Sequence, residues 1–254
     1  MPLEQLLPNN LFGAMLIFLR VGAALTLLPT FGELLVPQRY RLLLAVALAV
    51  LLSPVLVPQM PVLPSSPLQL GRIVAMETMA GAFIGILARI MLATLETAGM
   101  IVSLQLGLSS VLTMNPLMAQ QGAIVGALYG LIGTLIILLT DTHHLMLRAV
   151  VGSYGVFPPG AILPIGDLSE TITRTVGASF RVAIELSAPF IVVGTVFNIG
   201  VGVISRLVPQ VQIYFVTLPA QIVGGLILIV FLLAASLRWF LEYFISQFTS
   251  LLSG

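Results

Sequence analysis

Residues 97–140 read TAGMIVSLQLGLSSVLTMNPLMAQQGAIVGALYGLIGTLIILLT and contain no Asp, Glu, Lys or Arg. The stretch is about twice as long as the ~20 apolar residues that one membrane-spanning helix needs. Pro116, near its middle, has no amide hydrogen and disfavours helical geometry at Asn115. We therefore expect a helix that ends near Met114, an uncharged loop, and a second helix that ends at Asp141-Thr142-His143-His144. Because surface loops are polar, we expect this loop to be buried or to face something that charge would disturb.

The composition of the chain is that of an integral membrane protein. Hydrophobic residues make up 59% of it and charged residues only 7%, whereas soluble domains are about one quarter charged. The net charge of +1 gives no reason to expect a nucleic-acid partner. Cysteine is absent, which excludes disulfides and thiolate metal sites. The N-terminus carries Glu4 and no basic region, so we expect it to be the start of the mature chain and not a signal peptide.

The apolar residues gather in about six segments, which we expect to be helices. In lipid only helices and closed barrels satisfy their backbone hydrogen bonds, and these runs are too long for barrel strands. Prolines from Pro54 to Pro67 predict a break and an extended linker, residues 151–166 a loop, and residues 167–174 a short polar helix start. The expected fold is therefore all-α, a single helical domain over residues 1–254 made of hairpins packed inside a larger assembly. The segments are 11–29, 42–52, 70–93, the charge-free pair within 97–140, 180–206 and 211–237.

Glycine recurs at helical spacing in two of these segments. Gly81 and Gly85 lie four residues apart, as do Gly122, Gly126 and Gly130, so each set falls on nearly one face of a helix. Small residues at this spacing let helix backbones approach closely. These faces pack either against other helices of the same chain or against other subunits, and the sequence leaves both alternatives open.

Ionisable residues inside apolar segments are functional candidates, because charge is costly in lipid. Glu77 and Arg89 are twelve residues apart, about 18 Å along a helix, so each needs a partner elsewhere, in this chain or another. We expect Arg89 to make a buried ionic contact. Charges near the segment ends are mostly explained by interfacial solvation and by pairing at a spacing of four residues. The full set of candidates for buried charge or assembly is Glu77, Arg89, Arg181, Glu185 and Arg206.

Asp141, His143 and His144 suggest a metal site or a proton relay, but we expect a polar helix end at the membrane surface instead. Adjacent histidines point about 100° apart on a helix, which is poor geometry for chelation. No Glu or Cys lies nearby to complete a zinc set. The sequence also lacks a serine–histidine motif, a phosphate loop and paired carboxylates. We therefore expect no catalytic residues, no metal and no cofactor.

Met114 and Met118 flank Asn115-Pro116 in the uncharged loop. One interpretation is an ordinary loop with apolar residues. The other is a seal, because methionine is flexible and fills irregular gaps, so a Met-rich loop could close a channel against ions and still deform. The residues alone do not choose between the two.

The order of the motifs along the chain is more specific than any one of them. It resembles the FliR family of flagellar biosynthetic proteins, the FliR/SctT-like export-gate components of type III secretion, over essentially the whole chain. The Asp-x-His-His pattern is more similar to the flagellar branch than to the injectisome branch. The motifs are Arg20-Val21-Gly22-Ala23, Pro29-Thr30-Phe31-Gly32, Val36-Pro37-Gln38-Arg39-Tyr40-Arg41, Glu77 with Gly81, Ile84-Gly85, Ala88-Arg89, Gln105-Leu106-Gly107, Asn115-Pro116, Asp141-Thr142-His143-His144, Arg148, Ser153-Tyr154, Phe180-Arg181, Pro189, Asn198, Arg206 and Pro209-Gln210.

The resemblance implies an all-helical subunit, present once in a gate complex with several copies of FliP and FliQ. Its helices would belong to a conical assembly largely above the plane of the bacterial inner membrane, in the flagellar basal body and in contact with lipid. FlhB would join at the entrance, and FlhA would form the export platform beneath. The implied function is that of a non-enzymatic channel subunit through which unfolded flagellar proteins cross the inner membrane.

The resemblance also implies a pore plug after Gln105-Leu106-Gly107. The loop over residues 108–122 lies between Gly107 and Gly122, which could act as hinges, and an apolar constriction stops ions by excluding water. Plugs in this family are often richer in Phe than this loop. The expected plug residues are Leu108, Val111, Leu112, Met114, Asn115, Pro116, Leu117 and Met118.

The alternative function is that of a polytopic secondary transporter, with Glu77 and Arg89 as a coupling site at the membrane midplane. Transporters usually show two related halves with matching broken helices. Residues 1–127 and 128–254 show no convincing repeat, which counts against this alternative. An intramembrane enzyme, a third hypothesis, would lack catalytic groups.

Overall fold

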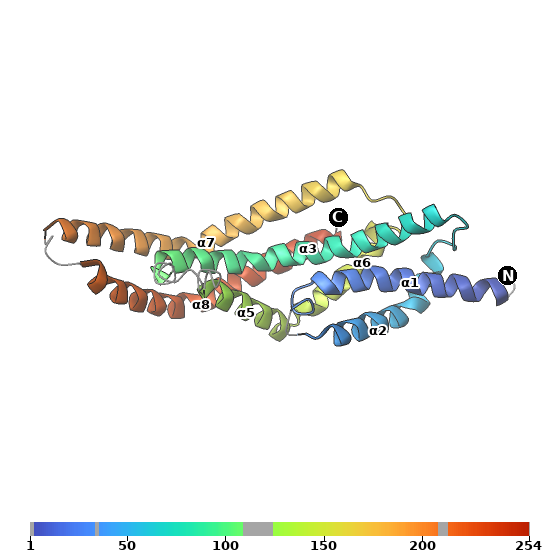
Figure 1. Cartoon of the computed structure of the whole chain (residues 1–254), viewed down its shortest axis with the longest axis horizontal. Coiled ribbons are helices and arrows are strands. Elements are labelled where there is room, and N and C mark those ends of the chain that lie inside the picture. The colour runs from blue at the N-terminus through green and yellow to red at the C-terminus, as the bar shows by residue number, and fades with distance from the viewer. Residues whose placement is uncertain (1–2, 34–35, 109–123, 208–212, 254) are drawn as a thin grey trace. The chain divides into compact units, whose positions relative to one another are not determined.

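The computed structural model describes residues 3–33, 36–108, 124–207 and 213–253, and Figure 1 labels their helices. No β-strand occurs among these residues, so the prediction of an all-α fold is confirmed. In chain order the elements are α1 (Leu3–Leu27), α2 (Gln38–Leu56), the short 3-10 helix η1 (Val57–Gln59), α3 (Pro67–Gln105), α5 (Ile124–Leu139), α6 (Thr142–Val156), α7 (Ile165–Leu207) and α8 (Ile213–Ser253).

The number of long apolar helices agrees with the six segments expected from the sequence. Among the described residues, five helices are long and apolar enough to cross a membrane, namely α1, α2, α3, α7 and α8. Helices α5 and α6 are separated by a short break and would make a sixth span if they count as one broken span. Asp141 lies at this break with a φ of 56°, a left-handed conformation in which the chain turns from one helix into the next.

Helix α3 differs from the expected helices in two ways. It joins the expected 70–93 segment to the first charge-free helix, because no proline separates them. It ends at Gln105 and not near Met114, since Gly107 takes a φ of 70°, a conformation that commonly terminates helices. Residues 109–123, which include Asn115 and Pro116, lie outside the described residues.

Proline ends fewer helices than the sequence predicts. Pro54 lies inside the last turn of α2, and Pro58 lies in η1, within the predicted extended linker. Helix α6 continues to Val156, into the predicted 151–166 loop. Helix α7 joins the predicted polar start at 167–174 to the apolar segment that follows. Each proline removes one backbone hydrogen bond, and local adjustments in a long helix can satisfy the group that is freed.

Contacts divide the chain into two compact units, each assembled from separate pieces of sequence. Unit 1 comprises Met1–Met91, Ile137–Thr175 and Ile245–Gly254, and unit 2 comprises Leu92–Ile136 and Val176–Phe244. Helices α3, α5, α7 and α8 contribute residues to both units. Neither unit is therefore a continuous segment of the chain, and the single domain over residues 1–254 stays a prediction.

In unit 1, α1 forms a hairpin with α2 and packs against α3 (Figure 1). The buried side chains of α1 recur at helical spacing and give the helix one apolar face. Phe12 and Leu16 on that face pack with Ile73 of α3. On the α2 side, a Cβ atom added to Gly22 would lie 3.9 Å from the Cβ of Ala45, so these two helices are in ordinary contact.

In unit 2, α3 packs against α5, and α7 pairs with α8. A Cβ atom added to Gly99 of α3 would lie 2.6 Å from the Cα of Gly126 on α5, so the two backbones touch. The hydroxyl oxygens of Ser179 on α7 and Tyr243 on α8 are hydrogen-bonded over 2.8 Å. The α1–α2 and α7–α8 pairs are helical hairpins of the kind expected from the sequence.

Candidate functional site

A buried ion pair joins α1 to α3 in unit 1. Arg20 Nε donates to Glu77 Oε2 over 2.8 Å, and each side chain is only 1% exposed. The other carboxylate oxygen of Glu77 accepts a hydrogen bond from the backbone amide of Gly160 over 3.1 Å. Sequence reasoning predicted that Glu77 needs a partner, and the structure identifies that partner as Arg20 of the same chain.

Arg20 has three further partners around its guanidinium group. Its Nη1 donates to Ser153 Oγ over 3.2 Å, and its Nη2 donates to the carbonyl oxygen of Phe157 over 3.0 Å. The ring of Tyr154 lies 4.0 Å from the Arg20 Cζ, within the range of a cation–π interaction. The network therefore ties α1, α3, α6 and the turn after α6 to one another. A buried ion pair is tolerated only when such additional bonds satisfy its remaining polar atoms.

Sequence reasoning missed Arg20 as a member of this site, although a signal was present. Arg20 is the single charged residue of the apolar segment 11–29, and Glu77 is the only acidic residue between positions 34 and 95. Lone opposite charges in two apolar helices are expected to pair, because neither is stable alone in a low-dielectric interior. The two charges do not reveal how the helices that carry them are aligned against one another.

The glycines of α3 lie against α1 beside the ion pair. A Cβ atom added to Gly81 would lie 2.0 Å from the carbonyl oxygen of Arg20, and one added to Gly85 would lie 2.5 Å from the Cβ of Leu27. Neither position has room for a side chain. These two glycines therefore pack within the chain, which is one of the two alternatives that the sequence left open.

The glycines of α5 face α3 in unit 2. Gly126 contacts the backbone of Gly99, and the side chain of Glu96 fills the space beside Gly130, where an added Cβ would lie 2.9 Å from Glu96 Oε1. Gly122, the third glycine of this predicted face, lies outside the described residues.

The chain that leads into the predicted pore plug is held by α8. Gln221 Nε2 donates to the carbonyl oxygen of Gln105 over 2.6 Å. The side chain of Leu106 lies directly against Gly225, where a Cβ atom would be 1.7 Å from Leu106 Cδ2. Of the expected plug residues only Leu108 is described, and it is partly buried. The others, Val111, Leu112, Met114, Asn115, Pro116, Leu117 and Met118, lie outside the described residues.

Arg89 is not buried within this chain, and the buried ionic contact expected for it, which could involve another subunit, stays a prediction. Its Nη1 lies 3.4 Å from Glu33 Oε1, and the two side chains are 50% and 29% exposed. Arg89 shares the exposed face of α3 with Met79 and Ile86, which lie at helical spacing from it. The face that buries Glu77 therefore does not bury Arg89.

The other charged candidates also lie at the surface of the chain. Arg181 pairs with Glu185 over 2.8 Å, with 81% and 32% of the two side chains exposed. Arg206 is exposed in the last turn of α7. Of the five candidates for buried charge, only Glu77 is buried in this chain, and a role of the others in assembly is a proposal.

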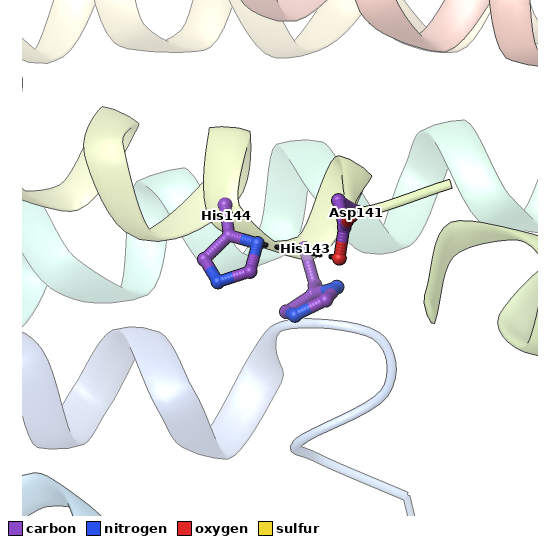
Figure 2. A group of neighbouring side chains, drawn as sticks. All are labelled: Asp141, His143 and His144. Carbon is purple, nitrogen blue, oxygen red and sulfur yellow. Dashed lines mark ion pairs between the residues drawn. The ribbon is translucent and has the colours of Figure 1, made fainter. Parts of the chain in front are cut away.

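Asp141, His143 and His144 converge at the start of α6, as Figure 2 shows. Their potential ligand atoms lie within 4.8 Å of one another, and the two imidazole rings are 4.1 Å apart between centroids. The prediction that the adjacent histidines diverge is therefore wrong here. Side-chain rotation in the first turn of the helix overcomes the 100° between their Cα positions.

An apolar cavity of about 340 Å³ lies in unit 1. Phe83, Leu87 and Phe248 are among its lining residues, and Asp167 supplies a carboxylate. The described residues that line it include no histidine, no cysteine and no second carboxylate. Asp167 therefore has no partner there for acid–base chemistry.

Large apolar surfaces of α2, α7 and α8 are exposed. Only 17% of the most apolar stretch of each is buried within the chain, against 61% for α3. Monomeric soluble proteins rarely expose apolar patches of this size, so lipid or other subunits are expected to cover these helices. Examples on α7 and α8 are Val196, Ile199, Val203, Val223, Val230 and Phe231.

These features define a helical membrane protein whose buried charges hold its own helices together and whose outer apolar faces need lipid or other subunits. The chain belongs to the family described as bacterial export proteins, family 1, which matches residues 11–247.

Several curated proteins similar to this chain carry the name flagellar biosynthetic protein FliR. The one from Caulobacter vibrioides is 35% identical over 220 residues, which cover 87% of this chain and 88% of the relative. The one from Bacillus subtilis is 27% identical over 226 residues, covering 87% and 86%. The one from Escherichia coli is 24% identical over 236 residues, covering 92% and 89%. The resemblance inferred from the order of motifs is confirmed.

Proposed function

We propose that this chain is the export-gate subunit of the flagellar type III secretion apparatus, through which unfolded flagellar proteins cross the bacterial inner membrane. The observation that carries the proposal is the similarity to FliR proteins over nearly the whole length of the chain and of its relatives. Five helices long and apolar enough to span a membrane fit a membrane-embedded subunit at the flagellar basal body.

The partners of this subunit are FliP and FliQ in the gate complex, and FlhB and FlhA in the export apparatus. The support in this chain is the amount of apolar surface that α2, α7 and α8 leave exposed. In the gate, the hairpins of FliP and FliQ cover part of that surface, and lipid covers the remainder. Arg89, Arg181 and Arg206 are exposed and available for contacts with these subunits.

The loop over residues 108–122 is the pore plug of this gate. It carries no charge over its full length, and its first residues follow a turn that α8 holds in place through Gln221. A closed gate must stop ions while the membrane holds its potential, and an apolar constriction does so by excluding water. Met114 and Met118 are suited to the seal because their side chains fill irregular gaps and still deform.

The subunit acts as a structural component of the export channel and not as an enzyme, and the support for this role is the similarity to FliR proteins.

A secondary transporter is not favoured. Glu77, its supposed coupling residue, is 1% exposed and bound to Arg20 and to Gly160, so it is closed to a transported ion. Arg89 lies on the exposed face of α3 and pairs with Glu33.

Deletion of the gene tests the function directly. Cells without this chain should secrete no flagellar filament protein into the medium, because the export channel is incomplete. A plasmid copy should restore secretion, which can be followed by immunoblotting of culture supernatants. Normal secretion by the deletion strain would overturn the proposal.

Shortening of the loop within residues 111–119 tests the plug. The mutant gate should assemble but let small ions or dyes into the cell, because the apolar constriction is lost. Replacing Met114 and Met118 with Ala should give a milder leak, and replacing both with Leu, which keeps the apolar volume, should give little or none. A normally assembled deletion mutant without added leak would show that this loop is ordinary packing.

A further inference from the structure

The two histidines of the chain and Asp141 form a compact group of metal-binding atoms at the start of α6 (Figure 2). The Nδ1 atom of His144 lies 3.6 Å from Asp141 Oδ1, and the nearest ring nitrogen of His143 falls within the same 4.8 Å cluster. From this arrangement we propose that Asp141, His143 and His144 bind a divalent transition-metal ion, and that this ion is Zn²⁺ in the first place.

The distances suit a small ion with nitrogen and oxygen ligands. Zn–N bonds near 2.0–2.1 Å and Zn–O bonds near 2.0–2.2 Å place neighbouring ligand atoms of a tetrahedral site about 3.3–3.5 Å apart. The separation between His144 Nδ1 and Asp141 Oδ1, 3.6 Å, is already close to that value. The widest separation in the cluster, 4.8 Å at most, needs a side-chain shift of roughly 1 Å, which rotation about the χ angles supplies.

The backbone explains why these side chains meet. Asp141 adopts a left-handed φ of 56° between α5 and α6, and this turn brings its side chain toward the first residues of α6. An Asp at this position usually accepts a hydrogen bond from a backbone amide of the following turn. Within the part of the chain that the structure describes, Asp141 makes no such capping bond, so its carboxylate is available as a ligand.

A second observation, independent of the cluster, comes from His143. Its Nδ1 atom is buried and has no hydrogen-bond partner among the described residues. A nitrogen removed from water without a partner is costly, and native structures rarely leave one in that state. If the ring is oriented so that Nδ1 faces His144 and Asp141, a metal ion supplies the missing partner.

The surroundings determine which ion fits and how tightly. Two imidazoles and one carboxylate suit Zn²⁺, Ni²⁺ and Cu²⁺ better than Mg²⁺ or Ca²⁺, which prefer oxygen ligands throughout. Asp141 and His144 are 79% and 61% exposed, so the ion can enter from solvent and water can complete its coordination. Asp141 and His144 line a surface groove, and Arg148 lines it too. Arg148 and the positive end of the α6 dipole both weaken the binding of a cation. The site is therefore expected to bind with modest affinity and in competition with protons, since imidazole must be neutral to ligate.

The composition of the chain makes the site unusually easy to test. His143 and His144 are its only histidines, and it has no cysteine. Any imidazole signal from this subunit must therefore come from this site.

The experiment uses the full chain, purified in its gate complex without a histidine tag. It measures the affinity for Zn²⁺ by titration calorimetry and the ligands of bound Cu²⁺ by electron paramagnetic resonance. The variants Asp141→Asn, His143→Gln and His144→Gln should each weaken Zn²⁺ binding at least about tenfold, since even residues behind the ligands change affinity about 10–100-fold. The Cu²⁺ spectrum should show two coupled imidazole nitrogens in the wild type and one in each single histidine variant. Arg238→Gln, an exposed arginine on α8 outside this groove, serves as the matched control and should bind like the wild type.

Three results would overturn the site. One is absence of Zn²⁺ binding by the wild type at millimolar concentration, and another is unchanged affinity in the His143→Gln/His144→Gln double variant. The third concerns Arg148→Gln, which should tighten metal binding by removing a nearby positive charge; weaker binding would mean that the ion does not lie beside Arg148 and so not between Asp141 and His144. If the histidine variants fold poorly, modification of the wild type with diethyl pyrocarbonate decides, because bound Zn²⁺ must protect both imidazoles and lack of protection rejects the proposal.

Discussion

At the scale of single residues, the buried pair of Arg20 and Glu77 shows how far sequence reasoning reaches. A lone Glu in an apolar helix demands a partner, and that demand is predictable because an unpaired buried charge is unstable. The identity of the partner is not predictable in the same way. Arg20 lies 57 positions away from Glu77, and only the packing of α1 on α3 brings the two together. The surroundings of Arg89 are not predictable either, since its spacing from Glu77 does not reveal which face of α3 this chain leaves exposed.

Removal of either member of this pair should destabilise the protein strongly. Glu77→Leu or Arg20→Met leaves one buried charge without its partner, a loss of about 3–5 kcal/mol. The melting temperature of the purified complex should fall by on the order of 10 °C. The double variant Arg20→Met/Glu77→Leu should melt closer to the wild type than either single variant, because no charge remains buried.

The matched control is Arg174→Gln, which breaks the exposed pair with Glu170 on α7. An exposed pair of this kind contributes about 0–1 kcal/mol, so the melting temperature should hardly change. If the single variants at Arg20 and Glu77 melt like this control, the buried network does not stabilise the fold.

At the scale of helices, the existence of the apolar segments was predictable and their ends were not. Long apolar runs leave few alternatives to a helix in lipid, which is why five spans and one bent pair agree with about six segments. The helix boundaries that we predicted from prolines were wrong, because Pro54 and Pro58 are accommodated in helical turns. The spacing of the glycines also predicted faces for close packing, but only the structure shows that Gly81 and Gly85 of α3 pack against α1.

Two glycines of α3 give a matched test of close packing. Gly81→Ala places a Cβ atom 2.0 Å from the Arg20 carbonyl oxygen, so α1 and α3 must separate, and stability should fall by about 1–3 kcal/mol or more. Gly71→Ala lies on the same helix, and no atom of the described residues comes within 4 Å of the added Cβ. It should raise stability by up to about 1 kcal/mol, since alanine is the better helix former. Thermal melting of both variants checks the prediction. Equal melting temperatures would mean that the close approach at Gly81 does not matter for the fold.

At the scale of the whole molecule, the chain exposes more apolar surface than it could keep in water. Helices α2, α7 and α8 are little buried when the chain is taken by itself. The composition, with 59% hydrophobic residues, already predicted that much apolar surface would be left exposed. Which subunits cover which helix was not predictable from physics, because an apolar face accepts lipid and protein alike. The proposed partners come from the resemblance to the family, and that resemblance was recognised from the order of the motifs.

Expression of the chain with and without its proposed partners tests this view. Expressed alone, it should be recovered in low yield and aggregate in detergent, since exposed apolar helices associate without specificity. Co-expression with FliP and FliQ should give a stable complex, measured as yield and as a single peak in size-exclusion chromatography. A monodisperse, fully folded monomer in detergent would contradict the expectation that other subunits cover these faces.

The ion pair between Arg20 and Glu77 also limits how this protein can evolve. A lineage that changes either codon first passes through a protein with one charge stranded in its interior, which a loss of about 3–5 kcal/mol disfavours. An apolar replacement of both residues avoids that loss, yet it requires two codon changes through the less stable intermediate. Gly81 belongs to the same set, because any larger residue there would displace the Arg20 backbone. We therefore expect these three positions to change rarely among relatives, because a single substitution at any of them disturbs the same buried contact.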